Sequence, residues 1–185
     1  MNKVGTETIE TSRLILRRFR IEDADDMYNN WASDPKVTEF LTWPTHSSEE
    51  ITKSLLTDWV SHYEEGDYFN WALEYKETGA VIGNISVVHL REDISAAEIG
   101  YCMGRAYWGK EIMPEALKAV IDYLFDKAEM NRICASHDVN NPKSGRVMDK
   151  AGMIPEGTLR AASKNNTGIC DVTYHSIIRR DREDK

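Results

Sequence analysis

The sequence predicts an α/β (α+β) fold in which helices cover the faces of a mixed sheet of about seven strands. Two observations support this prediction. Short runs of branched and aromatic residues alternate with amphipathic segments in the order βααβββαβαββ, and no repeat, low-complexity tract or linker interrupts the 185 residues. We therefore expect one domain over residues 1–185, with residues 1–10 and 181–185 frayed.

The N-terminal part predicts one strand followed by two helices. The run Leu14–Phe19 has the composition of a strand, and Ile21–Ser33 follows it as a helix. A second helix begins at a capping box formed by Ser47 and Glu50 and ends at Gly66.

The middle of the chain predicts three strands and the most strongly marked helix. Tyr68–Tyr75 and Val81–His89 are joined as a hairpin would be, and Ala97–Met103 is a third strand. Residues 113–128 place their apolar side chains on one face of a helix.

The C-terminal part predicts a short buried strand at Ile133–Ser136 and a helix over Pro142–Gly152, which starts with proline and stops at glycine. Two strands follow, Met153–Leu159 and Asp171–Arg179. We expect the polar run Ala161–Gly168 to be the loop between them.

The composition excludes several classes of protein. The 23 basic and 31 acidic residues give a net charge of −8, which argues against a nucleic-acid partner but permits a cationic substrate. No stretch has the length and apolarity of a membrane span or of the middle of a signal peptide, so we expect a cytoplasmic location. The widely spaced Cys102, Cys134 and Cys170 predict reduced thiols and no metal site.

The most informative stretch is EIGYCMGRAYWGKEIMPEAL at residues 98–117, where a strand runs through a glycine-containing loop into the amphipathic helix. Backbone N–H groups at a helix N-terminus suit a phosphate or pyrophosphate. The stretch lacks both the dinucleotide-fold and the P-loop glycine patterns. A tight connection that binds no ligand is an equal alternative on this stretch alone.

Three motifs in register give the chain a resemblance to the GNAT superfamily of acetyl-coenzyme A (acetyl-CoA) N-acetyltransferases. They are TSRLILRRFRIEDADDMY with ASDP after it, YWGKEIMPEAL, and NNPKSGRVMDKAGM followed by EGTLR. The resemblance covers residues 11–179 and is closest to the branch of the ribosomal-protein N-terminal acetyltransferases. It implies a mostly antiparallel sheet with helices on both faces, and acetyl-CoA as co-substrate.

The resemblance also implies which residues hold the coenzyme. The pyrophosphate loop of the family falls on Trp108, Gly109, Lys110, Glu111, Ile112 and Met113. The backbone of the strand through Tyr101 and Met103 pairs with the pantetheine arm, and Asn141 and Ser144 lie beside the coenzyme.

Three residues depart from the family pattern in this loop. Trp108 replaces a Gln or Arg, Glu111 replaces a Gly, and Met113 stands where Gly or Ala is usual. A carboxylate at Glu111 repels a pyrophosphate unless the side chain points away from it.

Amine acetylation needs a donor for the leaving thiolate, and a thiol pKa of about 8.5 means that a hydrogen bond can suffice. Many GNAT enzymes use a Tyr on the short helix, but Met148 occupies that position here and cannot donate. Ser144 lies one helical turn earlier and is our candidate donor. A surface or capping role for this serine is the alternative.

The candidates for the base are Glu98, on the strand before the loop, and His137, at the end of the Ile133 strand. Their alternatives are a solvated edge residue and a polar structural residue, and a water chain can replace a dedicated base. The family implies the backbone N–H of Met103 as oxyanion donor.

We expect the acceptor site to be bordered by Trp43, Pro44 and His46 and by the loop Ala161–Cys170. The predicted function is direct acetyl transfer to a primary amine, on a protein N-terminus or a small molecule, through a ternary complex in a monomer or homodimer. The alternatives are a coenzyme-binding sensor without turnover, and an enzyme for RNA-bound amines, which the negative charge disfavours.

Overall fold

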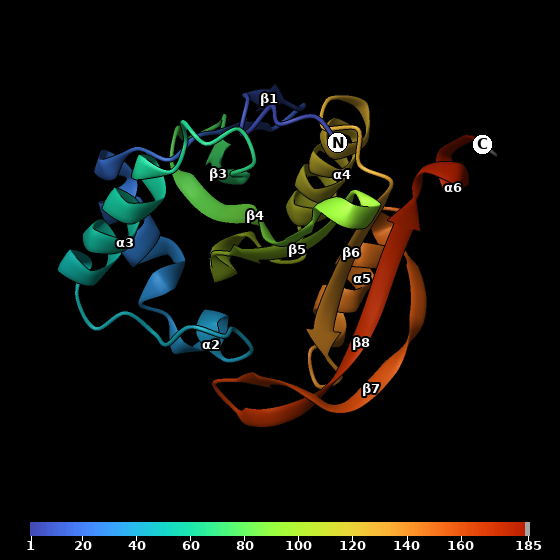
Figure 1. Ribbon diagram of the computed structural model, residues 1–185. Helices are drawn as coiled ribbons and strands as arrows, with labels where there is room; N and C mark the ends of the chain where they lie inside the picture. The colour runs from blue at the N-terminus through green and yellow to red at the C-terminus, as the bar shows by residue number, and fades with distance from the viewer. Residues whose placement is uncertain (184–185) are drawn as a thin grey trace.

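The computed structural model describes residues 1–183 and contains one eight-stranded sheet, in the order β1-β2-β3-β4-β5-β6-β8-β7 (Figure 1). All neighbouring strands are antiparallel except β5 and β6, which are parallel. The predicted mixed, mostly antiparallel sheet is confirmed, with one strand more than expected. The strands are β1 (Ile9–Glu10), β2 (Leu14–Arg17), β3 (Asn70–Tyr75), β4 (Val81–Arg91), β5 (Ala96–Met103), β6 (Arg132–Asp138), β7 (Ile154–Asn165) and β8 (Gly168–Ile178).

Helices lie on both faces of this sheet. They are α1 (Ala24–Met27), α2 (Pro35–Thr38), α3 (Glu49–Ser61), α4 (Ile112–Asp126), α5 (Pro142–Lys150) and α6 (Arg179–Glu183). Within the described residues no helix has the length and apolarity needed to cross a membrane.

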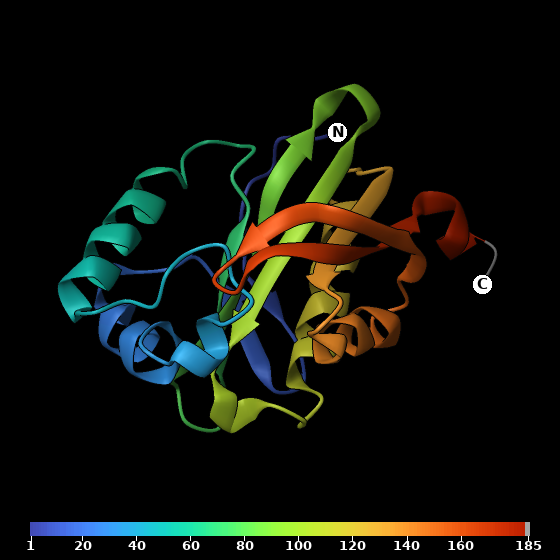
Figure 2. The same cartoon turned by 90° about the horizontal axis from the view of Figure 1, so that it is seen from below.

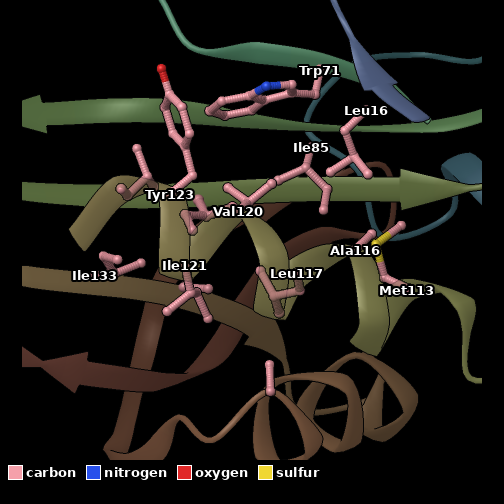
Figure 3. Close-up of a cluster of buried hydrophobic side chains, with 14 of the residues drawn as sticks. Leu16, Trp71, Ile85, Met113, Ala116, Leu117, Val120, Ile121, Tyr123 and Ile133 are labelled. Atoms are coloured by element: carbon pink, nitrogen blue, oxygen red, sulfur yellow. The ribbon is translucent and has the colours of Figure 1, made fainter. Parts of the chain in front are cut away.

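The main core lies between α4 and one face of the sheet. Alternate strand residues such as Leu16, Trp71 and Ile85 point toward Leu117 and Val120 of α4 (Figure 3). These side chains are completely shielded from solvent. The periodic apolar face that predicted this helix is therefore the face that α4 buries.

A second core lies on the opposite face, beneath α1 and α3. Phe19, Met27, Trp31 and Leu56 pack there against Ala72 of β3. Because Trp71 and Ala72 are consecutive in one strand, the alternation of the pleat sends them to different faces. The sheet is therefore covered on both sides, as expected.

The helix predicted over Ile21–Ser33 is divided in the structure. A 3-10 turn at Ile21–Asp23 precedes α1, and a wider π-helical turn at Tyr28–Ala32 follows it. The backbone N–H and the hydroxyl of Ser33 both donate to the carbonyl of Tyr28, which stabilises the wider turn. Apolar periodicity alone does not distinguish this irregular turn from an α-helix.

The predicted capping box of Ser47 and Glu50 does not form. The cap residue of α3 is Ser48, whose backbone is extended, and α3 ends at Ser61 rather than at Gly66. Ser47 satisfies the capping-box pattern, but the helix starts after Ser48, and the residue three positions after Ser48 is Ile51, which cannot complete a box.

The N-terminal residues, which we expected to be frayed, are held along the edge of the sheet. The N–H of Gly5 donates to the carbonyl of Gly66, and the hydroxyl of the buried Thr6 donates to the carbonyl of Tyr68. β1 then pairs with β2. At the other end α6 occupies most of the segment expected to fray, and residues 184–185 lie outside the described residues.

The polar run Ala161–Gly168 is a continuation of β7 and β8 and not the predicted loop, which is reduced to a turn at residues 166–167. The pairing shifts between Leu159 and Ser163, and Ala161 has a left-handed backbone with φ +48°. The N–H of Ala161 donates to Oδ1 of Asp171 at 2.8 Å, which holds this bulge. Such a bulge bends a hairpin, and Figure 2 shows the β7–β8 hairpin reaching across toward α2.

Candidate active site

The two parallel strands at the centre of the sheet separate, and this separation creates the candidate coenzyme site. β5 pairs with β6 only from Ala96 to Glu98, opposite Arg132 to Cys134. Beyond Glu98, β5 keeps β4 on one side and has no strand on the other. We call this region, residues 99–103 of β5 and 135–138 of β6, the β5–β6 opening. The freed backbone edge of β5 can bond an extended ligand as a neighbouring strand would.

The loop at residues 108–113 lies after β5 and leads into α4. Gly109 and Glu111 have left-handed backbones, with φ of +74° and +59°, and α4 begins at Ile112. Left-handed residues before a helix gather backbone N–H groups into a concave anion site. Ile112 and Met113 bury their side chains in the main core, so they contribute to this site through their backbone.

Arg13 fixes the direction in which the loop presents its peptide groups. Its two terminal nitrogens donate to the carbonyls of Lys110 and Glu111, both at 2.7 Å. In a trans peptide the N–H points opposite to the carbonyl. The N–H groups of Glu111 and Ile112 therefore point away from Arg13 and remain directed outward.

Glu115 holds Arg13 in place. Its carboxylate accepts from Nε of Arg13 at 2.7 Å and from the hydroxyl of Ser12 at 2.9 Å. Burial raises the pKa of Glu115, but hydrogen bonds from Thr11, Arg13 and Ser12 outweigh it and lower the pKa to about 2. Sequence reasoning missed Arg13 and Glu115, although both lie inside the motifs that it quoted.

The carboxylate of Glu111 forms an ion pair with Lys150 of α5. The ammonium group of Lys150 partly offsets the negative charge that Glu111 brings to the loop. The ammonium group of Lys110 lies 5.4 Å from the centre of the Tyr107 ring, where it supplies positive charge to the loop.

Trp108 closes the end of β5. Its indole nitrogen donates to the carbonyl of Met103 at 2.7 Å, and the ammonium of Lys143 lies 5.4 Å from its ring centre. The indole therefore links β5 to the start of α5, where the family places a Gln or Arg. One lone pair of the Met103 carbonyl is already used by this bond.

Ser144 of α5 lies across the β5–β6 opening from Tyr101 of β5. The phenol oxygen of Tyr101 is 2.9 Å from both the hydroxyl and the carbonyl oxygen of Ser144. Asn141 caps the same helix through its carbonyl, which accepts from the N–H of Ser144. Met148 is buried in the main core and does not face the opening.

The two candidate bases lie on opposite faces of the sheet. Glu98 lies on the face of the second core, where its carboxylate accepts a long hydrogen bond of 3.4 Å from Ser136. His137 lies on the face of α5, and a Cβ added to Gly145 would come within 2.6 Å of its Nε2. The close packing of His137 against α5 favours Glu98 as the base.

The segments expected to border the acceptor site meet at the tip of the β7–β8 hairpin. The side-chain amide of Asn166 donates to the carbonyls of Thr38 and Trp43, both at 2.8 Å, and its backbone N–H donates to that of Leu41. We call these three bonds the Asn166 clamp. They join residues 161–170 to the loop that follows α2.

His46 anchors this loop to α3. Its Nδ1 lies 2.7 Å from the hydroxyl of Thr52, and burial lowers its pKa, so the ring is neutral near pH 7. The ring of Trp43 packs on it with centres 5.2 Å apart, and Pro44 between them is exposed. His46 is therefore a structural part of the border.

The described residues contain no group of three or more His, Cys, Asp or Glu side chains that could hold a metal ion. The site consists instead of a free strand edge, a concave loop at a helix N-terminus and a hydroxyl pair. This combination fits an extended ligand that carries a pyrophosphate, and it defines the acyl-CoA-dependent class of transferase that the sequence resembles.

The chain belongs to the GNAT acetyltransferases, since the model of the acetyltransferase (GNAT) domain family matches residues 13–154. It is 32% identical to the N-acetyltransferase p20 of Bacillus licheniformis, over 95% of this chain and 98% of that one. It is also 32% identical to the ribosomal-protein-serine acetyltransferase of Escherichia coli, over 77% of this chain and 79% of that one.

Solved structures share the fold. The ribosomal-protein-S5-alanine acetyltransferase from Vibrio fischeri superposes with a TM-score of 0.83 at 24% identity, over 95% of this chain and 98% of that one. RimL, a ribosomal L7/L12 alpha-N-protein acetyltransferase solved with coenzyme A, gives 0.83 at 20% identity, over 93% and 98%. The family resemblance deduced from the sequence is confirmed.

Proposed function

We propose that this chain transfers the acetyl group of acetyl-CoA directly to a primary amine, through a ternary complex. The observation that carries the proposal is the β5–β6 opening, which is flanked by a loop whose N–H groups face away from Arg13. Acetyl-CoA supplies the acetyl group as an activated thioester.

The chain's own residues divide the task of holding the coenzyme. Backbone N–H groups of residues 109–113, with the charge of Lys110, bind the pyrophosphate. The edge of β5 at Tyr101 and Met103 bonds the pantetheine arm, and Trp108, Asn141 and Ser144 line the path between loop and α5. The backbone N–H of Met103 polarises the acetyl carbonyl.

The cysteines favour direct transfer over a covalent enzyme intermediate. Cys134 is half-buried beside Glu98, and burial and that charge both raise its pKa. Cys102 is buried, and its pKa is raised by burial to about 12. Both thiols remain protonated near pH 7, and a protonated thiol is a poor nucleophile.

Glu98 accepts the proton of the amine in this proposal. It lies at the last paired position of the β5–β6 ladder, opposite Cys134, on the face of the second core, and its carboxylate accepts from the hydroxyl of Ser136. His137, on the other face, has a packing role. The position of Glu98 lets a protonated amine bind beside a carboxylate before it loses its proton.

A protein N-terminus is the acceptor that we propose. Relatives at 32% identity include a ribosomal-protein-serine acetyltransferase and a ribosomal protein uS5 alanine N-acetyltransferase, both from Escherichia coli. The net charge of −8 attracts a cationic terminus and disfavours an RNA-bound amine. The cytoplasmic location and the monomeric or homodimeric state stay predictions.

Two measurements test the proposal. Calorimetric titration with acetyl-CoA is expected to show binding, and no heat at millimolar coenzyme would overturn it. Mass spectrometry of a panel of peptides that differ in their first residue, with polyamines and aminoglycosides as competitors, is expected to show acetylation of peptide N-termini. Acetylation of small amines alone would show that the acceptor is a small amine and not a protein N-terminus. Binding of acetyl-CoA without any acetylation would favour the coenzyme-binding sensor, which the loss of a donor at Met148 suggests.

A further inference from the structure

We propose that Tyr101 is a positioning residue that turns the hydroxyl of Ser144 toward the coenzyme sulfur, so that a phenol from strand β5 replaces the missing phenol of the short helix. The inference rests on the proposed function. It assigns the donor task to a pair of residues on two elements, where the sequence offered Ser144 alone.

The geometry of the pair is the first support. The phenol oxygen of Tyr101 is 2.9 Å from the hydroxyl oxygen of Ser144 and 2.9 Å from its carbonyl oxygen. The two residues belong to β5 and α5, the elements on either side of the β5–β6 opening. The pair therefore spans the region in which the thioester must lie.

The count of hydrogens is the second support. A phenol has one hydrogen to donate, and so has a serine hydroxyl. The carbonyl of Ser144 can only accept, so the phenol hydrogen is shared between the carbonyl and hydroxyl oxygens of Ser144 as a three-centre bond. The hydrogen of the Ser144 hydroxyl is then free to point at the sulfur. Without the phenol, the Ser144 hydroxyl is free to rotate away from the sulfur and bond other acceptors, as serines on helices often do.

The state of the phenol is the third support. Burial raises the pKa of Tyr101, and the hydrogen bond with Ser144 lowers it only in part. The phenol therefore keeps its proton near neutral pH and acts as a fixed donor rather than as an acid. This is the behaviour expected of a residue that positions another group.

Two nearby positions of α5 are unsuited to this task. Met148 is buried in the main core, and Gly145 packs directly on His137. Ser144 is the residue of the helix's first half whose side chain bonds across the opening.

In the transfer, the amine nitrogen forms a bond with the acetyl carbon, and the carbon–sulfur bond breaks with its electron pair going to sulfur. The amine proton passes to Glu98 and then to solvent. Ser144 donates a hydrogen bond to the departing sulfur, which takes its proton from solvent after release. Tyr101 gives up no proton in this step.

The test measures the bound thiol directly. Free coenzyme A is titrated in complex with the chain, and the ultraviolet absorbance of its thiolate is followed with pH. Tyr101→Phe keeps the ring and removes both hydrogen bonds, so the thiol pKa in the complex should rise. Ser144→Ala should raise it at least as much, and Ser144→Thr should restore it. Tyr123→Phe, which removes a buried phenol that donates to the carbonyl of Gly5 from the C-terminal half of α4, is the matched control.

Kinetics give the second readout. Tyr101→Phe should lower kcat about tenfold with the KM for acetyl-CoA nearly unchanged, since the lost bond acts on the departing sulfur. The Tyr101→Phe, Ser144→Ala double variant should be no slower than Ser144→Ala. Thermal unfolding checks that each variant folds.

The outcomes separate this inference from the proposed function. If coenzyme A binds but Tyr101→Phe changes neither thiol pKa nor kcat, the positioning role is wrong and the proposed function stands. If the wild-type chain binds no coenzyme A, both are wrong.

Discussion

The coenzyme side and the acceptor side of this site are built in different ways. The loop before α4 is tied by charge-assisted bonds between Arg13, Glu115 and two loop carbonyls, directly above the main core. The hairpin of β7 and β8 has an edge strand that is exposed over almost its whole length and is fastened at its tip by the Asn166 clamp.

The difference matches what each side must bind. A coenzyme that never varies is best held by a fixed loop, because a preorganised site loses little entropy on binding. A hairpin on the surface tolerates substitution without loss of the core, as loops and edges do. The scaffold can therefore keep its coenzyme chemistry while the acceptor changes.

The largest expected effect is that of Glu98→Gln, which should lower the rate of acetyl transfer and leave coenzyme binding unchanged. Glu98→Gln keeps the shape of the side chain and removes the base, so kcat/KM for the amine should fall about 100-fold at neutral pH. The dissociation constant for acetyl-CoA should not change. Glu92→Gln, which alters an exposed carboxylate paired with Lys3, is the control. An undiminished rate would assign deprotonation to a water chain.

The next effect tests the coenzyme side. Arg13→Ala removes the bonds that orient two loop peptides, so acetyl-CoA should bind about 10- to 100-fold more weakly by calorimetry. The arginine-to-alanine control is Arg91→Ala, because the guanidinium of Arg91 is exposed and pairs with the nearby Asp93. Equal affinity in Arg13→Ala would show that the loop at residues 108–113 holds its shape without the bonds from Arg13.

The pH dependence of the unfolding free energy tests the Arg13–Glu115 ion pair without any ligand. The folded pKa of Glu115 is about 2 against an ordinary value of 4.5. A lowered pKa stabilises the folded state above pH 4.5, and this stabilisation disappears as the pH falls toward 2. Glu115→Gln should therefore be about 1–2 kcal/mol less stable than wild type at pH 7. The difference in urea midpoint between wild type and Glu115→Gln should shrink below pH 4. A difference that stays constant with pH would contradict the ion-pair account.

The smallest effect belongs to the acceptor side. Asn166→Ala removes the two side-chain bonds of the Asn166 clamp, so the KM for the amine should rise about fivefold while acetyl-CoA affinity stays the same. Asn29→Ala, which loses two local bonds to Asp25 of α1, is the control. A change in coenzyme affinity would mean that the two sides are coupled.

The sequence predicted those features that depend on local patterns. The apolar periodicity located the main helix α4, and the motifs placed a loop before it and Ser144 on the short helix α5, as the structure has them. Whether the loop binds the coenzyme and whether Ser144 acts as the donor stay predictions. The bond between Arg13 and Glu115 joins residues 102 positions apart, and no local pattern shows such a contact.

The hairpin shows why other features were missed. Both faces of β7 are exposed, so residues 161–165 lack the alternation of buried and exposed side chains that marks a strand, and we expected a loop. The separation of β5 from β6 is likewise a property of strand pairing, which the residues of either strand alone do not reveal. The phenol of Tyr101 was missed because the family pattern assigned only its backbone.

Hydrogen exchange with and without acetyl-CoA tests the central claim most directly, because it reports on both sides of the site at once. The account predicts protection of the amides of residues 99–113, on the strand edge and in the loop. Residues 161–170 of the hairpin should exchange as before. Protection confined to the hairpin, or none in the loop at saturating coenzyme, would contradict the division of the site into a fixed coenzyme side and a separate acceptor side.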